Sequence, residues 1–161
     1  MEKINPSSNS KVGAETSYQV RELKKDDLDS SLGFLETLNN LAEVGNLNLQ
    51  KAEEVLEIIN AQGSRVIVAV TDEGQIIGSV TLMLEQKFLR AGKLAGHIED
   101  VVTRKGYEGL GVASALMKKA IEIAKESECY KLILDCQDEL IPFYKKFGFE
   151  EKGKFMKIYF E

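Results

Sequence analysis

The spacing of apolar positions along the chain predicts two helices first and a series of strands afterwards. After Asn48, apolar residues recur at the i, i+3, i+4, i+7 spacing of one helix face: Ala52, Val55, Leu56 and Ile59. Asn48 can cap this helix and Gly63 can end it. A helix is also expected over residues 26–38, with two aspartates as candidate caps and an apolar face of Leu28, Leu32 and Leu35.

From residue 65 onward the pattern changes to short β-branched runs. Residues 65–71 (RVIVAVT) and 75–85 (QIIGSVTLMLE) flank the turn sequence Asp72-Glu73-Gly74, which predicts a β-hairpin. A basic connection over residues 87–96 follows it. The remaining expected elements are a strand at 97–103, a helix from about Val112, a strand at 130–136, a helix at 142–147 before Gly148, and a strand at 154–160. With an extended segment near Tyr18, the predicted order is β-α-α-β-β-β-α-β-α-β.

Composition favours one globular domain. The chain has 161 residues, of which 43% are hydrophobic and 29% charged, as in soluble globular proteins. Residues 1–15, rich in Ser and Asn, are predicted to form a flexible tail, and residues 16–161 a single domain. The net charge of −5 argues against a general nucleic-acid-binding protein, whose affinity comes largely from phosphate neutralisation. A small anionic ligand is not excluded, because a few residues can oppose the global charge.

The reactive residue types are scarce. Cys129 and Cys136 are the two cysteines and His97 is the single histidine, so neither a disulfide framework nor a zinc site with recognisable ligand spacing is expected. No apolar run reaches the ~18 residues that cross a bilayer. We therefore expect a reduced, cytoplasmic protein without a metal, a membrane span or a nucleic-acid partner.

A glycine-rich loop lies between an expected strand and an expected helix. Its sequence is Glu108-Gly109-Leu110-Gly111-Val112-Ala113. Unpaired N–H groups at a helix N-terminus can bind a pyrophosphate, and glycines let it approach the backbone. Two glycines in an ordinary tight loop explain the same sequence, and the loop is neither a Walker A motif nor a full G-x-G-x-x-G. The loop alone leaves both interpretations open.

The order of motifs resembles the GNAT superfamily of acyl-CoA-dependent N-acyltransferases, over about residues 18–161. It consists of a strand, the x-G-x-G-x-A loop, an amphipathic helix, a strand, and the Phe-Tyr-Lys-Lys-Phe-Gly-Phe run of residues 143–149. The resemblance implies an α/β (α+β) fold with a mixed, mostly antiparallel central sheet flanked by helices. It also implies acetyl-CoA as cosubstrate, with its pyrophosphate on the loop amides. Glu108 departs from the family pattern, which has Arg or Gln there, and Arg104 and Lys105 are candidates to compensate.

Three further segments are similar to the glucosamine 6-phosphate N-acetyltransferases within that superfamily. These are Gly-His-Ile-Glu-Asp-Val-Val at 96–102, Cys-Tyr-Lys-Leu-Ile-Leu-Asp-Cys at 129–136, and the basic segment at 87–90. The resemblance implies direct transfer of acetyl to the 2-amino group of an amino-sugar phosphate, a step that feeds UDP-N-acetylglucosamine synthesis. It further implies a homodimer with the C-terminal strand near or across the interface. Ala42, Leu140 and Tyr159 depart from the family's usual residues, which leaves the phosphate ligands open.

The resemblance assigns roles to individual residues. Glu99 and Asp135 are expected to serve the amine, Asp135 through its backbone carbonyl, and Tyr144 to protonate the leaving thiolate. Glu99 and Asp100 are adjacent on a strand, so both can face one site only if the strand bulges. The cofactor would be bound by Val101, Val102, Thr103, Gly109, Leu110, Gly111, Val112, Ala113, Ser114, Tyr144, Lys145 and Lys146. The substrate would be bound by Lys87, Phe88, Leu89, Arg90, Glu99, Asp100, Val101, Tyr130, Lys131 and Asp135.

Other interpretations remain open at this point. A GNAT enzyme that acts on a protein amine or another small amine would share the loop, and so would a non-catalytic CoA-binding module. A nucleophilic pair of Cys136 and His97 is disfavoured, because GNAT chemistry is direct attack without an acyl-enzyme. A flavodoxin-like or Rossmann-type binder is weaker still, since an antiparallel hairpin precedes the glycine loop.

Overall fold

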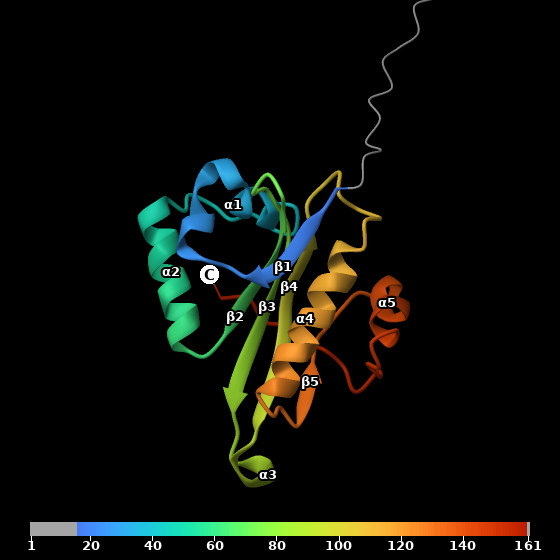
Figure 1. Cartoon of the computed structure of the whole chain (residues 1–161). Helices are drawn as coiled ribbons and strands as arrows, with labels where there is room; N and C mark the ends of the chain where they lie inside the picture. Colours follow the sequence, from blue (N-terminus) through green and yellow to red (C-terminus); the bar gives the residue numbers. More distant parts are fainter. Residues whose placement is uncertain (1–15, 161) are drawn as a thin grey trace, which may run out of the picture.

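The computed structural model describes residues 16–160, so the predicted tail at 1–15 lies outside the described residues. Its centre is a five-stranded sheet in the order β1-β2-β3-β4-β5 (Figure 1). The strands are β1 Tyr18–Glu22, β2 Arg65–Thr71, β3 Ile76–Gln86, β4 Leu94–Thr103 and β5 Lys131–Ile133. The first four pair antiparallel and β5 pairs parallel to β4. The expected mixed, mostly antiparallel sheet is confirmed.

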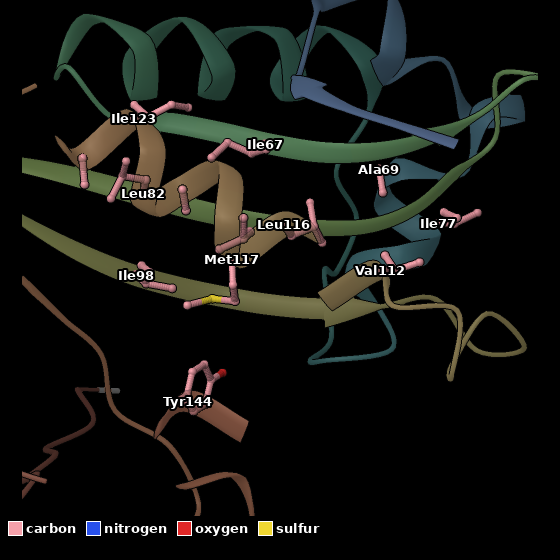
Figure 2. Close-up of a cluster of buried hydrophobic side chains, with 13 residues drawn as sticks. Ile67, Ala69, Ile77, Leu82, Ile98, Val112, Leu116, Met117, Ile123 and Tyr144 are labelled. Atoms are coloured by element: carbon pink, nitrogen blue, oxygen red, sulfur yellow. The ribbon is translucent and has the colours of Figure 1, made fainter. Parts of the chain in front are cut away.

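Helices cover both faces of this sheet and enclose two hydrophobic cores. One face carries α1 Phe34–Leu38 and α2 Leu49–Ala61, and the other carries α4 Val112–Glu126 and α5 Ile141–Lys145 (Figure 1). The core under α4 includes Ile67, Leu82, Ile98, Leu116 and Met117 (Figure 2). The short elements are the 3₁₀ turns η1 Lys25–Leu28, η2 Ser30–Leu32 and η3 Asp138–Leu140, and the single turn α3 Leu89–Gly92.

The two long helices follow the sequence prediction closely. The Asn48 side chain caps α2 by accepting a hydrogen bond from the Lys51 N–H at 2.9 Å. The single helix expected over residues 26–38 is wrong: the segment forms η1, η2 and α1 instead. Gly33 adopts a left-handed conformation with φ of 79°, which ends η2 and redirects the chain before α1.

The final strand expected at 154–160 is also wrong. Residues 150–160 are exposed and form no strand. Five large apolar side chains of this segment lie 60–90% exposed: Phe155, Met156, Ile158, Tyr159 and Phe160. β-propensity alone does not make a strand, because a strand also needs an edge to pair with and a face to bury.

The two neighbours of β4 pair with it over different lengths. β3 pairs with β4 from Gly78↔Thr103 to Gln86↔Leu94. β5 pairs with β4 only at Ala95↔Lys131, Gly96↔Leu132 and His97↔Ile133. Beyond His97, therefore, no strand of the described chain pairs with β4 on its β5 side.

Candidate active site

Polar side chains gather where β4 and β5 stop pairing. The parallel register that joins His97 to Ile133 would place Glu99 beside Asp135 if it continued for two more residues. Ligand atoms of His97, Glu99 and Asp135 do lie within 4.8 Å of one another. His97 Nε2 is 3.1 Å from Glu99 Oε1. The structure thus brings together two carboxylates expected at the amine site, and adds an imidazole that the sequence analysis gave no role.

The β4 strand bulges beside this cluster. Asp100 has a φ of 53°, and the register with β3 shifts between Ser79 and Thr81. This pattern is a β-bulge, which interrupts the alternation of side chains along a strand. Glu99 is half-buried and Asp100 is exposed. The bulge that two adjacent acidic residues would need in order to serve one site is therefore present.

Tyr144 lies on the α4 side of the sheet. α5 carries it, and the residue is 7% exposed within the core under α4 (Figure 2). Its ring packs edge-on against that of Phe143, with ring centroids 5.0 Å apart. Burial raises the pKa of its hydroxyl, and the charges of Cys136 and Asp135 raise it further. The phenol therefore holds its proton at neutral pH and can donate it. Within residues 16–160 the hydroxyl makes no hydrogen bond, so it is free to serve a ligand.

The thiol of Cys136 is poorly suited to nucleophilic attack. Burial raises its pKa, and nearby carboxylates of Asp135, Asp138 and Glu151 raise it further. Cys136 packs against the core under α4 and has no part in the His97 cluster. Direct attack by the amine needs no such nucleophile.

The glycine loop forms an open cradle at the N-terminus of α4. Gly109 and Gly111 have φ of 80° and 77°, and Gly111 is the N-cap residue. A Cβ built on Gly109 would meet nothing within 4 Å, and one on Gly111 only the Tyr18 hydroxyl at 3.8 Å. That hydroxyl donates to the Leu110 carbonyl at 3.1 Å, which ties the loop to β1. The first-turn amides of α4, from Val112 to Ser114, have no acidic neighbour in that turn and suit an anion.

Glu108 turns into its own loop. Its Oε2 accepts a hydrogen bond from the Gly106 N–H at 2.7 Å. Arg104 does not compensate for it, since its guanidinium binds the Glu36 carboxylate and the Gln75 side chain on the other side. The Lys105 N–H donates to the Asn40 side chain. Glu108 therefore replaces the family's Arg or Gln with a residue whose side chain stabilises the fold of its own loop.

A basic hollow lies near the β3–β4 hairpin. Arg90, Lys93 and Tyr130 line a volume of about 380 Å³. The Lys131 ammonium lies 5.5 Å from the centroid of the Tyr130 ring. Lys93 was not predicted from the sequence as a binding residue. Its position three residues after Arg90, on the same basic connection, could have indicated it.

The other expected residues are placed less favourably. Lys87 pairs with Glu85, and Phe88 and Leu89 extend into solvent at the hairpin tip by α3 (Figure 1). On the cofactor side, Val102 is buried, while Val101, Thr103 and Ala113 are half-buried. Lys145 pairs with Glu151 at 2.7 Å, and Lys146 is exposed.

No helix among residues 16–160 has both the length and the apolar character needed to cross a bilayer.

The chain as a whole is similar to known acetyltransferases. It is 36% identical over 152 residues to a probable glucosamine 6-phosphate N-acetyltransferase 2 of Oryza sativa subsp. japonica, covering 91% of this chain and 92% of the relative. The crystal structure of glucosamine-6-phosphate N-acetyltransferase from Arabidopsis thaliana superposes with a TM-score of 0.85 at 32% identity, covering 90% of this chain and 99% of that one. The crystal structure of an acetyltransferase from Trypanosoma brucei superposes with a TM-score of 0.83 at 34% identity, covering 89% of this chain and 100% of that one. A profile of the acetyltransferase (GNAT) family matches residues 34–149. The chain belongs to the GNAT family of acetyltransferases.

Proposed function

We propose that this protein transfers acetyl from acetyl-CoA to the 2-amino group of glucosamine 6-phosphate. The observation that carries the proposal is the arrangement around the unpaired end of β4. Glu99 and Asp135 lie together on one side of it, and the protonated phenol of Tyr144 lies in the core on the other. The relatives from Oryza sativa and Arabidopsis thaliana are named for acetylation of glucosamine 6-phosphate, which supports this substrate.

The carboxylates serve the amine. At neutral pH most of an alkyl amine is ammonium, and it must lose a proton before it can attack. Among residues 16–160, neither Glu99 nor Asp135 forms an ion pair with a lysine or arginine, so both can accept from an ammonium. Glu99, half-buried beside β5, binds the ammonium and takes its proton directly or through water. The Asp135 backbone carbonyl is a second acceptor.

The other half of the reaction uses backbone donors and Tyr144. The first amides of α4 bind the pyrophosphate of acetyl-CoA, and Gly109 and Gly111 leave room for it. The N–H group of Val101 stabilises the negative oxygen that forms when the amine attacks the thioester carbonyl, whereas the N–H of Val102 points toward Ser79 on β3. As the tetrahedral intermediate collapses, the C–S bond breaks and Tyr144 gives its proton to the departing thiolate. The nitrogen loses its second proton as it becomes the amide, and this proton restores the phenol through water. The products are the amide and free CoA, with no acyl-enzyme.

The sugar phosphate is assigned to the hollow by the hairpin. Arg90 and Lys93 supply cations there, and the Tyr130 hydroxyl can donate to a phosphate oxygen. Lys131 lies next to it. This placement gives the acidic chain a local positive site for an anionic substrate.

A homodimer is the proposed assembly. The apolar side chains at residues 155–160 are exposed in the single chain, and their burial against a second copy would remove them from water. Sedimentation of the full chain tests this assembly, and a monomer at micromolar concentration would contradict it.

We also propose a cytoplasmic location. The two cysteines are unpaired, as thiols usually are in the reducing cytosol.

A free-thiol release assay with acetyl-CoA tests the proposed reaction. Glucosamine 6-phosphate, glucosamine and a lysine peptide are compared as acceptors. We expect turnover that is strongest with glucosamine 6-phosphate, because only that acceptor carries both an amine for the carboxylates and a phosphate for the cations. Turnover with the peptide alone would assign the site to a protein amine, and no thiol release with any acceptor would indicate a CoA-binding module.

A further inference from the structure

We propose that His97, Glu99 and Asp135 form a binding site for a divalent transition-metal ion such as Zn²⁺, in preference to Mg²⁺. The metal is an inhibitor and no part of the acetyl transfer. Metal binding as such does not depend on the proposed function. The expected inhibition rests on the proposed function, because it follows from the roles proposed for Glu99 and Asp135.

The three side chains have the right ligand chemistry and nearly the right spacing. An imidazole nitrogen and two carboxylate oxygens lie within 4.8 Å of one another. Zinc bonds to such atoms are about 2.0–2.2 Å long, which places two ligands of a tetrahedral ion roughly 3.3–3.5 Å apart. His97 Nε2 and Glu99 Oε1 are already 3.1 Å apart. Asp135 is exposed, so its side chain can rotate toward them.

The backbone holds two of the ligands in place. His97 pairs with Met83 on β3 and with Ile133 on β5, so strands flank it on both sides. Glu99 pairs with Thr81 on β3. Both side chains therefore project from a fixed strand, and only Asp135, two residues past β5, has to adjust. Little ordering is needed when the ion binds.

The charge of the cluster favours a cation, and its composition selects among cations. Two carboxylates lie beside one imidazole, and no arginine or lysine within residues 16–160 forms an ion pair with either of them. A mixed nitrogen and oxygen set suits Zn²⁺. Mg²⁺ prefers oxygen ligands in an octahedron and retains its water. Zn²⁺ is therefore expected to bind much more tightly than Mg²⁺.

A bound ion would block the proposed amine site. It occupies the carboxylate oxygens that would accept from the ammonium, and it repels that cation. Inhibition is therefore expected to compete with the amino sugar and not with acetyl-CoA, whose cradle lies at the N-terminus of α4.

Zinc binding can be measured without turnover. The chain has one histidine, so a single imidazole is seen by ¹⁵N NMR and its change on adding Zn²⁺ is unambiguous. We expect 1:1 binding by calorimetry, a shifted imidazole, and no shift with equal Mg²⁺. His97→Gln and Asp135→Asn should each weaken Zn²⁺ binding by at least about tenfold, because even residues that only orient metal ligands contribute about 10–100-fold. Cys136→Ser is the matched control, since it removes a thiol next to Asp135 and should leave the affinity unchanged.

Several outcomes would overturn the site. An imidazole unaffected at saturating Zn²⁺ would do so, as would unchanged affinity in His97→Gln or a large loss in Cys136→Ser. Circular dichroism checks the fold of each variant, and the exposed position of Asp135 makes Asp135→Asn decisive if the histidine variant does not fold. In a separate titration, glucosamine 6-phosphate should raise the apparent Kd for Zn²⁺. If Zn²⁺ binds as expected but the sugar does not compete, the metal site holds and the proposed amine site is wrong.

Discussion

The two sides of β4 differ in what they do. On the β3 side the strand is paired along its length, and the neighbouring side chains form a closed core. On the β5 side pairing ends at His97, and near this point the side chain of Glu99 is half-buried and that of Asp135 is exposed. One strand thus provides rigidity through one edge and chemistry through the other. Substitutions on the paired side should therefore reduce stability, and substitutions on the open side should reduce the rate.

Among the substitutions that act on the rate, Tyr144→Phe should give the largest effect, although Tyr144 lies in the core under α4. General acid catalysis contributes about 10²–10⁴-fold, so kcat should fall by that range while the KM for acetyl-CoA stays nearly unchanged. The melting temperature should hardly change, because the hydroxyl has no hydrogen-bond partner among residues 16–160. Steady-state kinetics and thermal melts provide both readouts. An unchanged kcat would remove Tyr144 from the mechanism.

Leu82→Ala should give the largest effect on the paired side. Leu82 is 0% exposed, and truncation of such a leucine costs about 2–5 kcal/mol of unfolding free energy. Met83→Ala is the matched control, since Met83 is the next residue of β3 and is 45% exposed, so its cost should stay below about 1 kcal/mol. Urea unfolding measures both. Equal losses in the two variants would contradict the location of the core.

Arg90→Ala combined with Lys93→Ala should act on the sugar phosphate alone. A hydrogen bond to a charged group contributes about 1.5–3 kcal/mol when shielded, and these side chains are exposed, so we expect the KM for glucosamine 6-phosphate to rise by about tenfold. The rise should shrink in high salt, because exposed charges are screened. The KM for acetyl-CoA should not change. Lys118→Ala on the exposed side of α4 is the control, and an equal effect there would assign the change to bulk charge.

Glu108→Gln should give the smallest effect. The glutamine oxygen can still accept from the Gly106 N–H, so the loop keeps its fold while the charge beside the pyrophosphate site is removed. Charges near a helix N-terminus contribute about 0.3–1 kcal/mol at low ionic strength, so the affinity for acetyl-CoA should rise by a few-fold at most. Calorimetry at low salt measures it. A weaker affinity would mean that the carboxylate itself supports cofactor binding.

Local patterns predicted the elements whose forces are local. The apolar face and the Asn48 cap of α2, the hairpin of β2 and β3, and the glycine-led start of α4 are all present as expected. The helix expected over residues 26–38 was wrong, because an apolar period cannot show that Gly33 adopts a left-handed conformation. The strand expected at 154–160 was wrong, because strand pairing depends on a partner that its own residues do not specify.

The candidate site shows the same division. The chemical groups available to the site can be read from the residues alone: two acidic residues near one histidine, a tyrosine in an aromatic run, and glycines before a helix. Three features follow only from the folded chain: β5 stops pairing at Ile133, β4 bulges at Asp100, and Asp135 lies beside His97 and Glu99. The chemistry of a side chain is known from its residue type alone. Distances between strands far apart in the chain arise from register, twist and packing, which depend on the whole fold at once.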